Sequence, residues 1–552
     1  MMKKQKMLIC FALLFALAGC TRQIQTETTA QQHNQSVQTA TQNQPQQTPQ
    51  VPVQEGGTLY LCMRSALTLN PILNEDDSVD AILKLIYMPL IKLDQNHKPT
   101  PSIAQSWSFD ETGTVLSMNL RSDITWQNGT NLTADDVIFS LQALDRAGEN
   151  VVYKDCMKYI SNYRKTGTYS VEITFRQNFS GNLYALQMPI VSRQYYGSEN
   201  LEQSPNDMIP MGNGYFAFEK YVPAKEMVLN KCNSSFGTMA HIDKIVVTIS
   251  TDEDTDLYSF EQGLTDLLVV SSSDMGKSDN ENSTKYYEYT TNYFDFVGFN
   301  FTKSLFQDSN VRKAIASTLP KESILENVYL SRGSVTESFV NPQYWFYEAN
   351  VTKYDFDIEQ AQTYLEASNW KDTNEDGILD KTTNELTETF QISILYNTEN
   401  EIRKQIAIRL ADELRGIGAE VFLDGQPYEI YVQKLQSGNF DLFVGGWQFS
   451  VVPDYSFILH SSQVGQANYM RYQNAEIDAL LDAAYSSVNE ADIKTAYSNL
   501  QKKAAEELPF ISVAFRNSVL LSSDRVYGEV KPLESNIYDT INQWFLYEQP
   551  SS

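Results

Sequence analysis

Short strand-like and helix-like segments alternate along this chain from Gly57 onward. Residues 57–61 (GTLYL) predict a strand, and apolar residues at helical spacing predict a helix over 78–90 with Ser78 as its N-cap. A further helix should begin at Thr133, because two acidic residues follow it and suit the positive end of a helix dipole. At 552 residues the chain exceeds what one hydrophobic core supports, so the pattern predicts an α/β protein with two or three lobes.

The N-terminus has the layout of an export signal. Met7 to Gly19 is an apolar stretch of 13 residues behind three lysines, too short to span a bilayer. It ends in Leu17-Ala18-Gly19-Cys20, which resembles a bacterial lipobox, where small residues precede a cysteine that takes a diacylglycerol. We expect a signal peptide over 1–19 and lipidation of Cys20; the alternative is a plain secretory signal with an incidental cysteine.

The residues after Cys20 predict a spacer. Residues 21–55 are rich in Gln, Thr and Pro, and they bury too little apolar surface to offset the entropy of ordering. We therefore predict a lipidated cysteine and disordered tether over 20–55.

The net charge of −27 repels nucleic acid and anionic lipid. This charge argues against nucleic-acid binding and leaves the lipid anchor as the membrane contact.

Three cysteines remain in the body of the chain: Cys62, Cys156 and Cys232. They are widely spaced, and no CxxC or Cys/His spacing supports a zinc site. One disulfide among the three is compatible with the sequence, which does not indicate the pair.

Residues 440–457 (FDLFVGGWQFSVVPDYSF) form the best candidate for a ligand contact. An apolar, strand-like run breaks at Gly445-Gly446 and presents Trp447. Paired glycines allow the backbone a sharp turn or the close approach of a ligand, and a large aromatic residue behind them suits a pocket wall. The alternative is a core tryptophan capped by an ordinary loop.

An ordered series of motifs resembles the extracellular solute-binding proteins of family 5, the oligopeptide- and dipeptide-binding receptors of ABC importers. In the first half of the chain these are Leu69-Asn70-Pro71, Ile86 to Leu90, Pro101 to Trp107, Ile124 to Gly129 and Leu132 to Val137. In the second half they are Val297 to Phe301, Val311 to Ile315, Ile417 to Val421 and Leu508 to Ile511. Each piece is weak alone, but together they extend over most of the body, from Gly57 to Leu546.

The resemblance implies a two-lobed, periplasmic-binding-protein-like α/β fold with hinge strands and an extra subdomain inserted in the first lobe. It assigns 57–72, 210–296 and 517–552 to the core lobe, 73–209 to the inserted subdomain, and 297–516 to the second lobe. By position it makes Trp447 a ligand-wall residue, with backbone groups of Gly446 and Gln448 beside it. The facing segment would be Ser65, Ala66 and Leu67; Tyr344 and Trp345 are either further wall residues or core residues.

One position departs from the family pattern. Peptide-binding members carry an Asp three residues after the Trp, where it pairs with the ligand's α-ammonium, but this chain has Ser450. A buried ammonium without a carboxylate is costly. Asp454 would supply the charge only if the loop took another route, so an uncharged, N-blocked or differently anchored solute stays open.

A candidate calcium loop lies at Asp372, Asn374, Asp376 and Asp380, with oxygen ligands in calcium-loop order and a glycine at position 6. The bidentate carboxylate that closes such loops is missing, so the alternative is a polar turn. We predict no other cofactor.

No catalytic motif is present among the common hydrolase and phosphate-binding patterns. The sequence therefore predicts a non-enzymatic, monomeric, lipid-anchored receptor on the extracellular face of a bacterial membrane, which passes a small, peptide-like solute to an ABC permease. The alternatives are a surface sensor or adaptor without transport and a secreted hydrolase.

Overall fold

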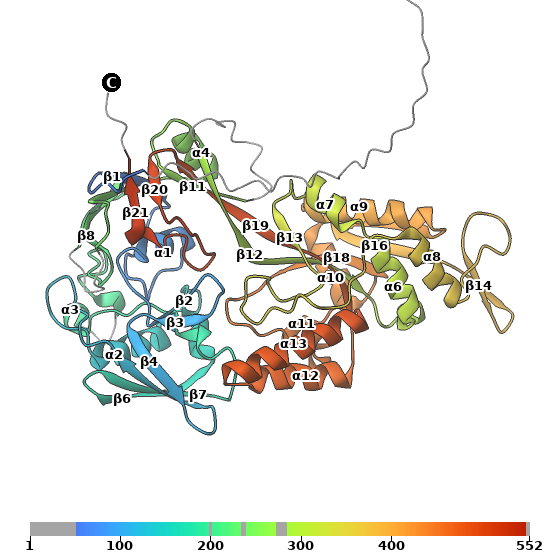
Figure 1. Cartoon of the computed structure of the whole chain (residues 1–552), viewed down its shortest axis with the longest axis horizontal. Coiled ribbons are helices and arrows are strands. Elements are labelled where there is room, and N and C mark those ends of the chain that lie inside the picture. Colours follow the sequence, from blue (N-terminus) through green and yellow to red (C-terminus); the bar gives the residue numbers. More distant parts are fainter. Residues whose placement is uncertain (1–50, 198–200, 233–238, 272–283, 548–552) are drawn as a thin grey trace, which may run out of the picture. The chain divides into compact units, whose positions relative to one another are not determined.

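The computed structural model describes residues 51–197, 201–232, 239–271 and 284–547 (Figure 1). These residues build two large hydrophobic cores. Trp126 and Trp544 are among the largest side chains of the first core, and Phe299 and Phe306 of the second. Within this part of the chain, the helices are all too short or too polar to cross a membrane.

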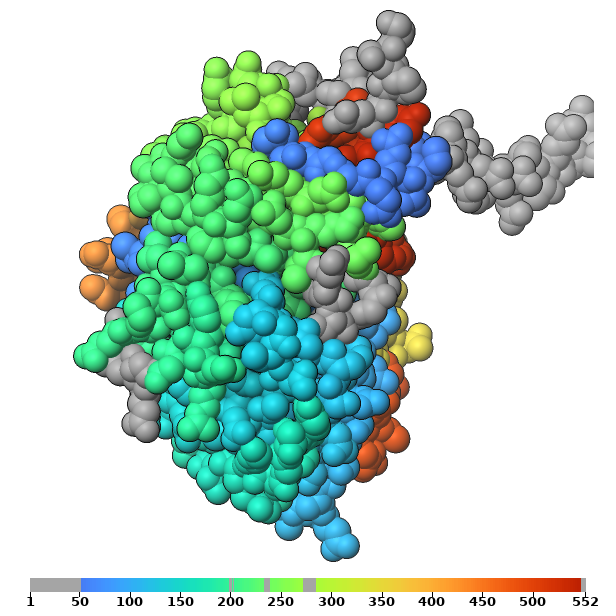
Figure 2. All heavy atoms as spheres, turned by 90° about the vertical axis from the view of Figure 1, so that its left-hand side faces the viewer, coloured from blue at the N-terminus to red at the C-terminus, as the bar shows by residue number. Residues whose placement is uncertain are grey.

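The first core is covered by a four-stranded sheet in the order β1-β10-β9-β8. Its strands are β1 (Thr58–Met63), β8 (Phe216–Val222), β9 (Glu226–Lys231) and β10 (Lys244–Ile249). Leu59 and Leu61 alternate with more exposed neighbours along β1 and are fully buried. The C-terminal hairpin of β20 (Val526–Gly528) and β21 (Trp544–Leu546) lies beside β1, red against blue in Figure 2.

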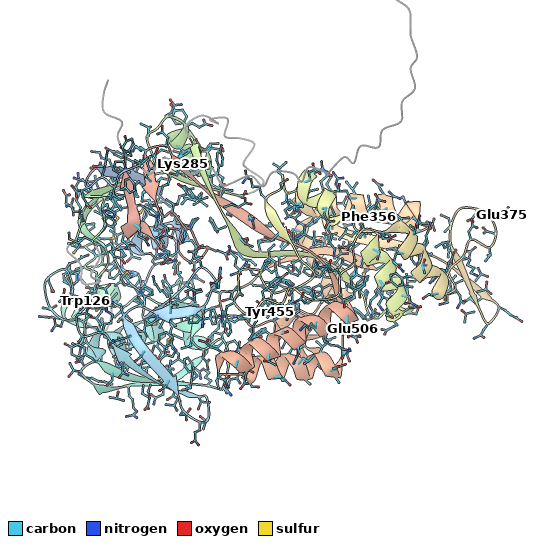
Figure 3. All side chains as sticks on the ribbon, viewed as in Figure 1. Trp126, Lys285, Phe356, Glu375, Tyr455 and Glu506 are labelled. Carbon is cyan, nitrogen blue, oxygen red and sulfur yellow. The ribbon has the colours of Figure 1, made fainter. Side chains whose placement is uncertain are left out.

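A second four-stranded sheet, β4-β5-β7-β6, packs against the same core. The elements of this region are α1 (Asp77–Leu83), β2 (Ile91–Leu93), β3 (Pro99–Pro101), β4 (Ala104–Phe109), β5 (Val115–Leu120), α2 (Ala134–Arg146), β6 (Ile160–Gly167), β7 (Ser170–Phe175) and α3 (Arg193–Tyr196). Trp126, labelled in Figure 3, is buried in this region.

The predicted cap of α2 is confirmed and that of α1 is wrong. Thr133 is the N-cap of α2, and its N–H donates to the Asp136 carboxylate (2.8 Å). Helix α1 is capped by Asp76, whose carboxylate accepts the N–H groups of Ser78 (2.8 Å) and Val79 (3.0 Å). Ser78 therefore lies inside the helix. The helix also ends at Leu83, so the predicted extension to 90 is wrong.

The second core surrounds a seven-stranded mixed sheet in the order β11-β19-β12-β18-β16-β17, with β13 paired to β19. Its strands are β11 (Leu267–Ser271), β12 (Thr284–Phe299), β13 (Gly333–Val335), β16 (Gln391–Asn397), β17 (Glu420–Gln426), β18 (Leu442–Gln448) and β19 (Phe510–Ser523). The longer helices here are α6 (Ser309–Ser317), α7 (Lys321–Asn327), α8 (Ile358–Ala367), α9 (Glu401–Gly416), α10 (Tyr428–Ser437), α12 (Ala475–Ser486) and α13 (Glu490–Glu507).

The remaining elements are α4 (Glu253–Glu261), α5 (Ser304–Gln307), α11 (Ser456–Leu459) and the hairpin of β14 (Asp380–Thr383) and β15 (Leu386–Thr389). Glu375, in the exposed loop before β14, points away from the neighbouring helices in Figure 3.

Two long strands belong to both cores. In β12, Tyr287 packs against the first core, whereas Phe294 and Phe299 lie in the second. In β19, Leu520 lies in the first core and Phe515 in the second. These strands therefore connect the two lobes.

Candidate functional site

The stretch around the paired glycines differs from its prediction. Strand β18 runs through Gly445 and Gly446 without a break and pairs antiparallel with β12. The glycines are needed for close packing. A Cβ on Gly445 would lie 2.7 Å from the Phe443 ring, and one on Gly446 would lie 2.7 Å from Asp295 Oδ1. The predicted sharp turn is wrong, and the group that approaches Gly446 closely is a buried carboxylate of the protein.

Trp447 is partly buried at the end of β18 and packs on the second core. Its ring meets the edge of Phe457 at 5.2 Å and lies parallel to Tyr469, with the ring centroids 6.2 Å apart. Gln448 and Ser450, which follow it, are exposed, whereas Phe449 is buried. The end of β18 thus offers an aromatic wall beside exposed backbone.

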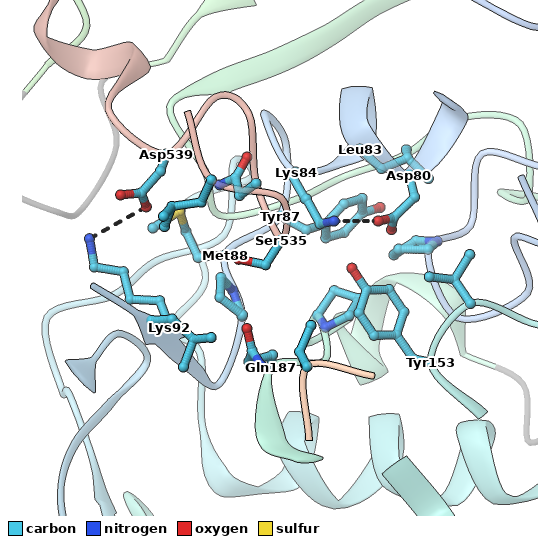
Figure 4. Close-up of a pocket in the computed structure, with 18 of the residues that line it drawn as sticks. Asp80, Leu83, Lys84, Tyr87, Met88, Lys92, Tyr153, Gln187, Ser535 and Asp539 are labelled. Carbon is cyan, nitrogen blue, oxygen red and sulfur yellow. Dashed lines mark ion pairs between the residues drawn. The ribbon is translucent and has the colours of Figure 1, made fainter. Parts of the chain in front are cut away.

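A cavity of about 330 Å³ lies where residues 450–452 face the first lobe. The wall is mainly apolar and phenolic, with two ion pairs shown in Figure 4: Asp80 with Lys84 (2.6 Å) and Lys92 with Asp539 (3.9 Å). Residues from the first-lobe side include Pro71, Leu83, Tyr87, Met88, Tyr153, Tyr184, Gln187, Tyr215, Leu533, Ser535 and Asn536. This is a concave site with a few placed polar groups, as is typical of small-molecule binding sites.

Burial changes the titration of the groups around this cavity. It raises the pKa of Asp539, an effect that nearby Lys92 reduces and Asp94 adds to. Burial also holds the pKa of the Tyr153 phenol well above its usual value, helped by its contact with Asp80. Tyr153 is therefore a neutral hydrogen-bonding group, and the ion pairs supply the charge on the wall.

The structure brings only some of the predicted site residues to this cavity. Ser450 lines it, with Val451 and Val452. The preceding predicted residues of β18 lie outside the lining: Gly446, Trp447 and Gln448. Asp454 borders a separate small hollow with Tyr455 and Tyr485, and its carboxylate accepts the N–H of Ser456 (2.9 Å).

The predicted facing segment also lies outside the lining. Ser65 is exposed and Leu67 is 96% exposed, a high value for a large apolar side chain. The N–H of Ala66 donates to the hydroxyl of Tyr221 (3.2 Å). The side chain of Leu67 is thus free to contact a partner molecule.

Tyr344 and Trp345 join the two lobes. Tyr344 is buried, stacks on His97 at 4.7 Å and donates its hydroxyl to the Val451 carbonyl (3.1 Å). Trp345 donates its indole N–H to the Tyr184 hydroxyl (3.0 Å). Both residues therefore hold the cavity wall at 451 and 184 in place, and neither is part of the lining.

Reasoning from the sequence missed the first-lobe wall of the cavity, including Lys92, Tyr153 and Asp539. These residues come from segments far apart in the chain, and no local motif marks them. It also missed Glu534, whose carboxylate accepts the N–H of Asn292 (2.8 Å). Asn292 lies on β12, opposite the residue that follows β18.

The candidate calcium loop forms a self-contained turn. The Asp372 carboxylate accepts the N–H groups of Asp376 (3.2 Å) and Gly377 (2.9 Å), and the Asn374 amide donates to Asp376 (2.9 Å). Asp380 is buried, whereas the other three predicted ligands are exposed. Across the described ranges, no group of three or more His, Cys, Asp or Glu side chains is arranged to hold a metal ion. Calcium binding by this loop stays a prediction.

The three body cysteines, Cys62, Cys156 and Cys232, are unpaired and partly buried. Cys20 lies outside the described residues, so its lipidation stays a prediction.

Comparisons with known proteins extend over most of the chain. The family model described as "Bacterial extracellular solute-binding proteins, family 5 Middle" matches residues 98–469. The oligopeptide-binding protein AppA of Bacillus subtilis (strain 168) is 27% identical over 510 residues, 89% of this chain and 92% of its own length. The heme-binding protein A of Haemophilus influenzae is 23% identical over 501 residues, 86% of this chain and 89% of its own length.

Among solved structures, HbpA2 from Haemophilus parasuis superposes with a TM-score of 0.76 at 20% identity, covering 89% of this chain and all of that one (100%). This similarity confirms the two-lobed α/β fold class predicted from the sequence.

Proposed function

This chain belongs to the bacterial extracellular solute-binding proteins of family 5, and from this we propose that it is a lipid-anchored receptor that captures a peptide-like solute and delivers it to an ABC importer. Members of the family are binding proteins of transporters rather than enzymes, so the hydrolase alternative falls away.

The observation that carries the proposal is the cavity between residues 450–452 and the first lobe. A solute held there touches both lobes, and β12 and β19 connect those lobes. Binding therefore favours a closed arrangement of the lobes, since only that arrangement gives the solute both sets of contacts. A permease that recognises the closed arrangement would distinguish the loaded receptor from the empty one.

The named binding residues have separate roles in this proposal. Trp447 and its aromatic neighbours, outside the cavity lining, form a wall for the part of the solute that extends beyond the cavity along β18. Segment 65–67, in which Ser65 and Leu67 are exposed, and the backbone at 446–450 offer main-chain groups to an extended solute, in the manner of strand addition. Main-chain contacts tolerate many side chains, which suits a peptide, the class of solute named for the Bacillus relative.

The anchor in this proposal is a diacylglycerol on Cys20 after removal of residues 1–19, with the following residues as a spacer. A lipid-anchored receptor stays close to a permease in the same membrane. The protein works as a monomer at the outer face of the cell membrane.

The test is a thermal-shift screen of the mature protein against tetrapeptide libraries, with monosaccharides and heme as comparison solutes. A solute that binds only the native state raises the melting temperature. We expect a rise with peptides. No rise with any of these solutes, together with tight binding to a protein partner, would favour the sensor or adaptor instead.

A further inference from the structure

Strand β18 separates from β12 at Phe449, and a side chain takes the hydrogen bond that would continue the ladder. The N–H of Phe449 donates to the Asn292 carbonyl (2.9 Å). In a regular antiparallel pair the N–H of Asn292 would donate back to Phe449. It donates instead to Glu534 Oε2 (2.8 Å), so this carboxylate lies where β18 ends, beside the residue that precedes Ser450.

Glu534 comes from the opposite side of the cleft. It belongs to the C-terminal segment, whose Tyr538 packs in the first core. Its chain neighbours Leu533 and Ser535 line the cavity together with Ser450. The carboxylate itself is outside the cavity lining, but it stands between two lining residues of the first lobe and the end of β18, and its side chain is partly exposed.

This carboxylate has a hydrogen-bond donor but no cation. Its partner is the Asn292 N–H, and no lysine, arginine or histidine in the described part of the chain forms an ion pair with it. Burial raises the pKa of Glu534 to about 7. In the same described part, no donor hydrogen-bonds the backbone carbonyl of Phe449 or Ser450. The Glu534 carboxylate and the two backbone carbonyls at the end of β18 can therefore accept further hydrogen bonds from a solute.

The other carboxylates near the cavity are already engaged. Asp80 is paired with Lys84, and Asp155 with Lys158 (2.7 Å). Asp539 faces Lys92. Asp454 lies at a different hollow. Glu534 is therefore the carboxylate best placed to meet a positive charge beside Ser450.

We propose that Glu534 binds an ammonium group of the solute at the end of β18, and so replaces the carboxylate that Ser450 cannot supply. The inference rests on the proposed function and deepens it, because it assigns the solute a free amino terminus. An ammonium has three N–H donors, which the Glu534 carboxylate and the carbonyls of Phe449 and Ser450 can accept. Charge-assisted hydrogen bonds of this kind are stronger than neutral ones.

The test compares Glu534→Gln with Glu111→Gln, a matched loss of charge at an exposed residue in the turn between β4 and β5. Gln keeps an oxygen for the Asn292 N–H and removes the charge. The probes are two tetrapeptide libraries without Lys and Arg, one with free amino termini and one N-acetylated, titrated at pH 8 by thermal shift.

We expect Glu534→Gln to weaken binding of the free-amine library by about 30-fold or more, the usual effect of truncating a buried charge pair. Glu111→Gln should bind like the unsubstituted protein, which should prefer the free-amine library. If Glu534→Gln bound the free-amine library as tightly as the unsubstituted protein, Glu534 would not be the ammonium site. The same would follow if the unsubstituted protein preferred the acetylated library. In either case the proposed function would stand. If the unsubstituted protein bound neither library, the proposed function as a peptide receptor would be wrong, and the assignment of Glu534 as its ammonium site would be wrong with it.

Discussion

Asp295 and Arg516 form a two-pronged ion pair directly beneath β18, with Nε and Nη2 of the arginine 2.7 Å and 2.9 Å from the carboxylate oxygens. Asp295 is fully buried and also accepts the hydroxyl of Tyr329 (2.7 Å). Gly446 lies over this pair, so the backbone that leads to Trp447 rests on a buried charge network.

Adding a methyl group at Gly446 should therefore destabilise the protein. In Gly446→Ala the Cβ would meet Asp295 Oδ1 at 2.7 Å, and shifting that carboxylate would disturb the pair with Arg516. We expect a loss of about 1–3 kcal/mol in the free energy of unfolding, measured by chemical denaturation. Gly416→Ala is the matched control because no atom lies within 4 Å of its added Cβ. Equal stabilities for the two variants would contradict this packing.

Removing the Trp447 ring should weaken solute binding while leaving the fold intact. The ring is only partly buried and packs on the edge of the second core. In Trp447→Ala we expect binding of the free-amine tetrapeptide library to fall about 10-fold or more, in line with the loss of a large aromatic contact. Trp447→Phe should recover part of it. Tight binding by Trp447→Ala would remove this residue from the site.

Glu534 should make the ligand-free protein less stable at alkaline pH. Burial on folding raises the pKa of Glu534 from 4.5 to about 7, so the folded state holds the proton more tightly than the unfolded state. Well below pH 4.5 Glu534 is protonated in both states and does not change the free energy of unfolding. Between pH 4.5 and 7 it lowers the free energy of unfolding increasingly, and above pH 7 the loss is constant at about 1–3 kcal/mol.

Glu534→Gln should accordingly raise the melting temperature at pH 8 and leave it nearly unchanged at pH 4.5. Groups facing Glu534 include the phenols of Tyr289 and Tyr344, whose pKa values burial raises, so both stay neutral in this range. Burial lowers the pKa of His97, so protonation of His97 at low pH destabilises the fold. This effect is the same in both proteins and cancels in the difference between their melting temperatures. A lower melting temperature for Glu534→Gln at pH 8 would show that the charge stabilises the ligand-free fold.

The lipid anchor predicts where a cysteine variant is found. Cys20→Ser removes the thiol that takes the diacylglycerol, so we expect the protein to leave the membrane fraction. Cys232→Ser, at a partly buried body cysteine, should stay with the membrane. Cell fractionation with mass measurement of the N-terminal peptide tests both. Retention of Cys20→Ser on the membrane would contradict lipidation at this residue.

The sequence predicted the elements whose signals are local. The Thr133 cap with two acids behind it was sufficient to place the start of α2. Ser78 misled because Asp76, two residues earlier, has a carboxylate that accepts the N–H groups of Ser78 and Val79, so the helix begins before Ser78. Both residues are good caps, and only the backbone geometry decides between them.

The site was less accessible to prediction because its parts meet only in three dimensions. The position of Ser450 on the cavity follows from the order of motifs around Trp447. The pairing of Glu534 with Asn292 joins residues far apart in the chain, and a lone glutamate after Pro-Leu has no distinguishing pattern. The role of Gly446 likewise depends on Asp295, which lies on another strand.

Filling the cavity at Ser450 tests the central claim most directly. Ser450→Trp places a bulky side chain on the exposed wall of the cavity, where it should exclude solute without disturbing either core. Ser108→Trp, at an exposed position of β4, is the control. We predict that calorimetric titration with the free-amine tetrapeptide library gives heat for the control and none for Ser450→Trp, with both proteins melting near the unsubstituted temperature. Undiminished binding by Ser450→Trp would contradict the assignment of this cavity as the solute site.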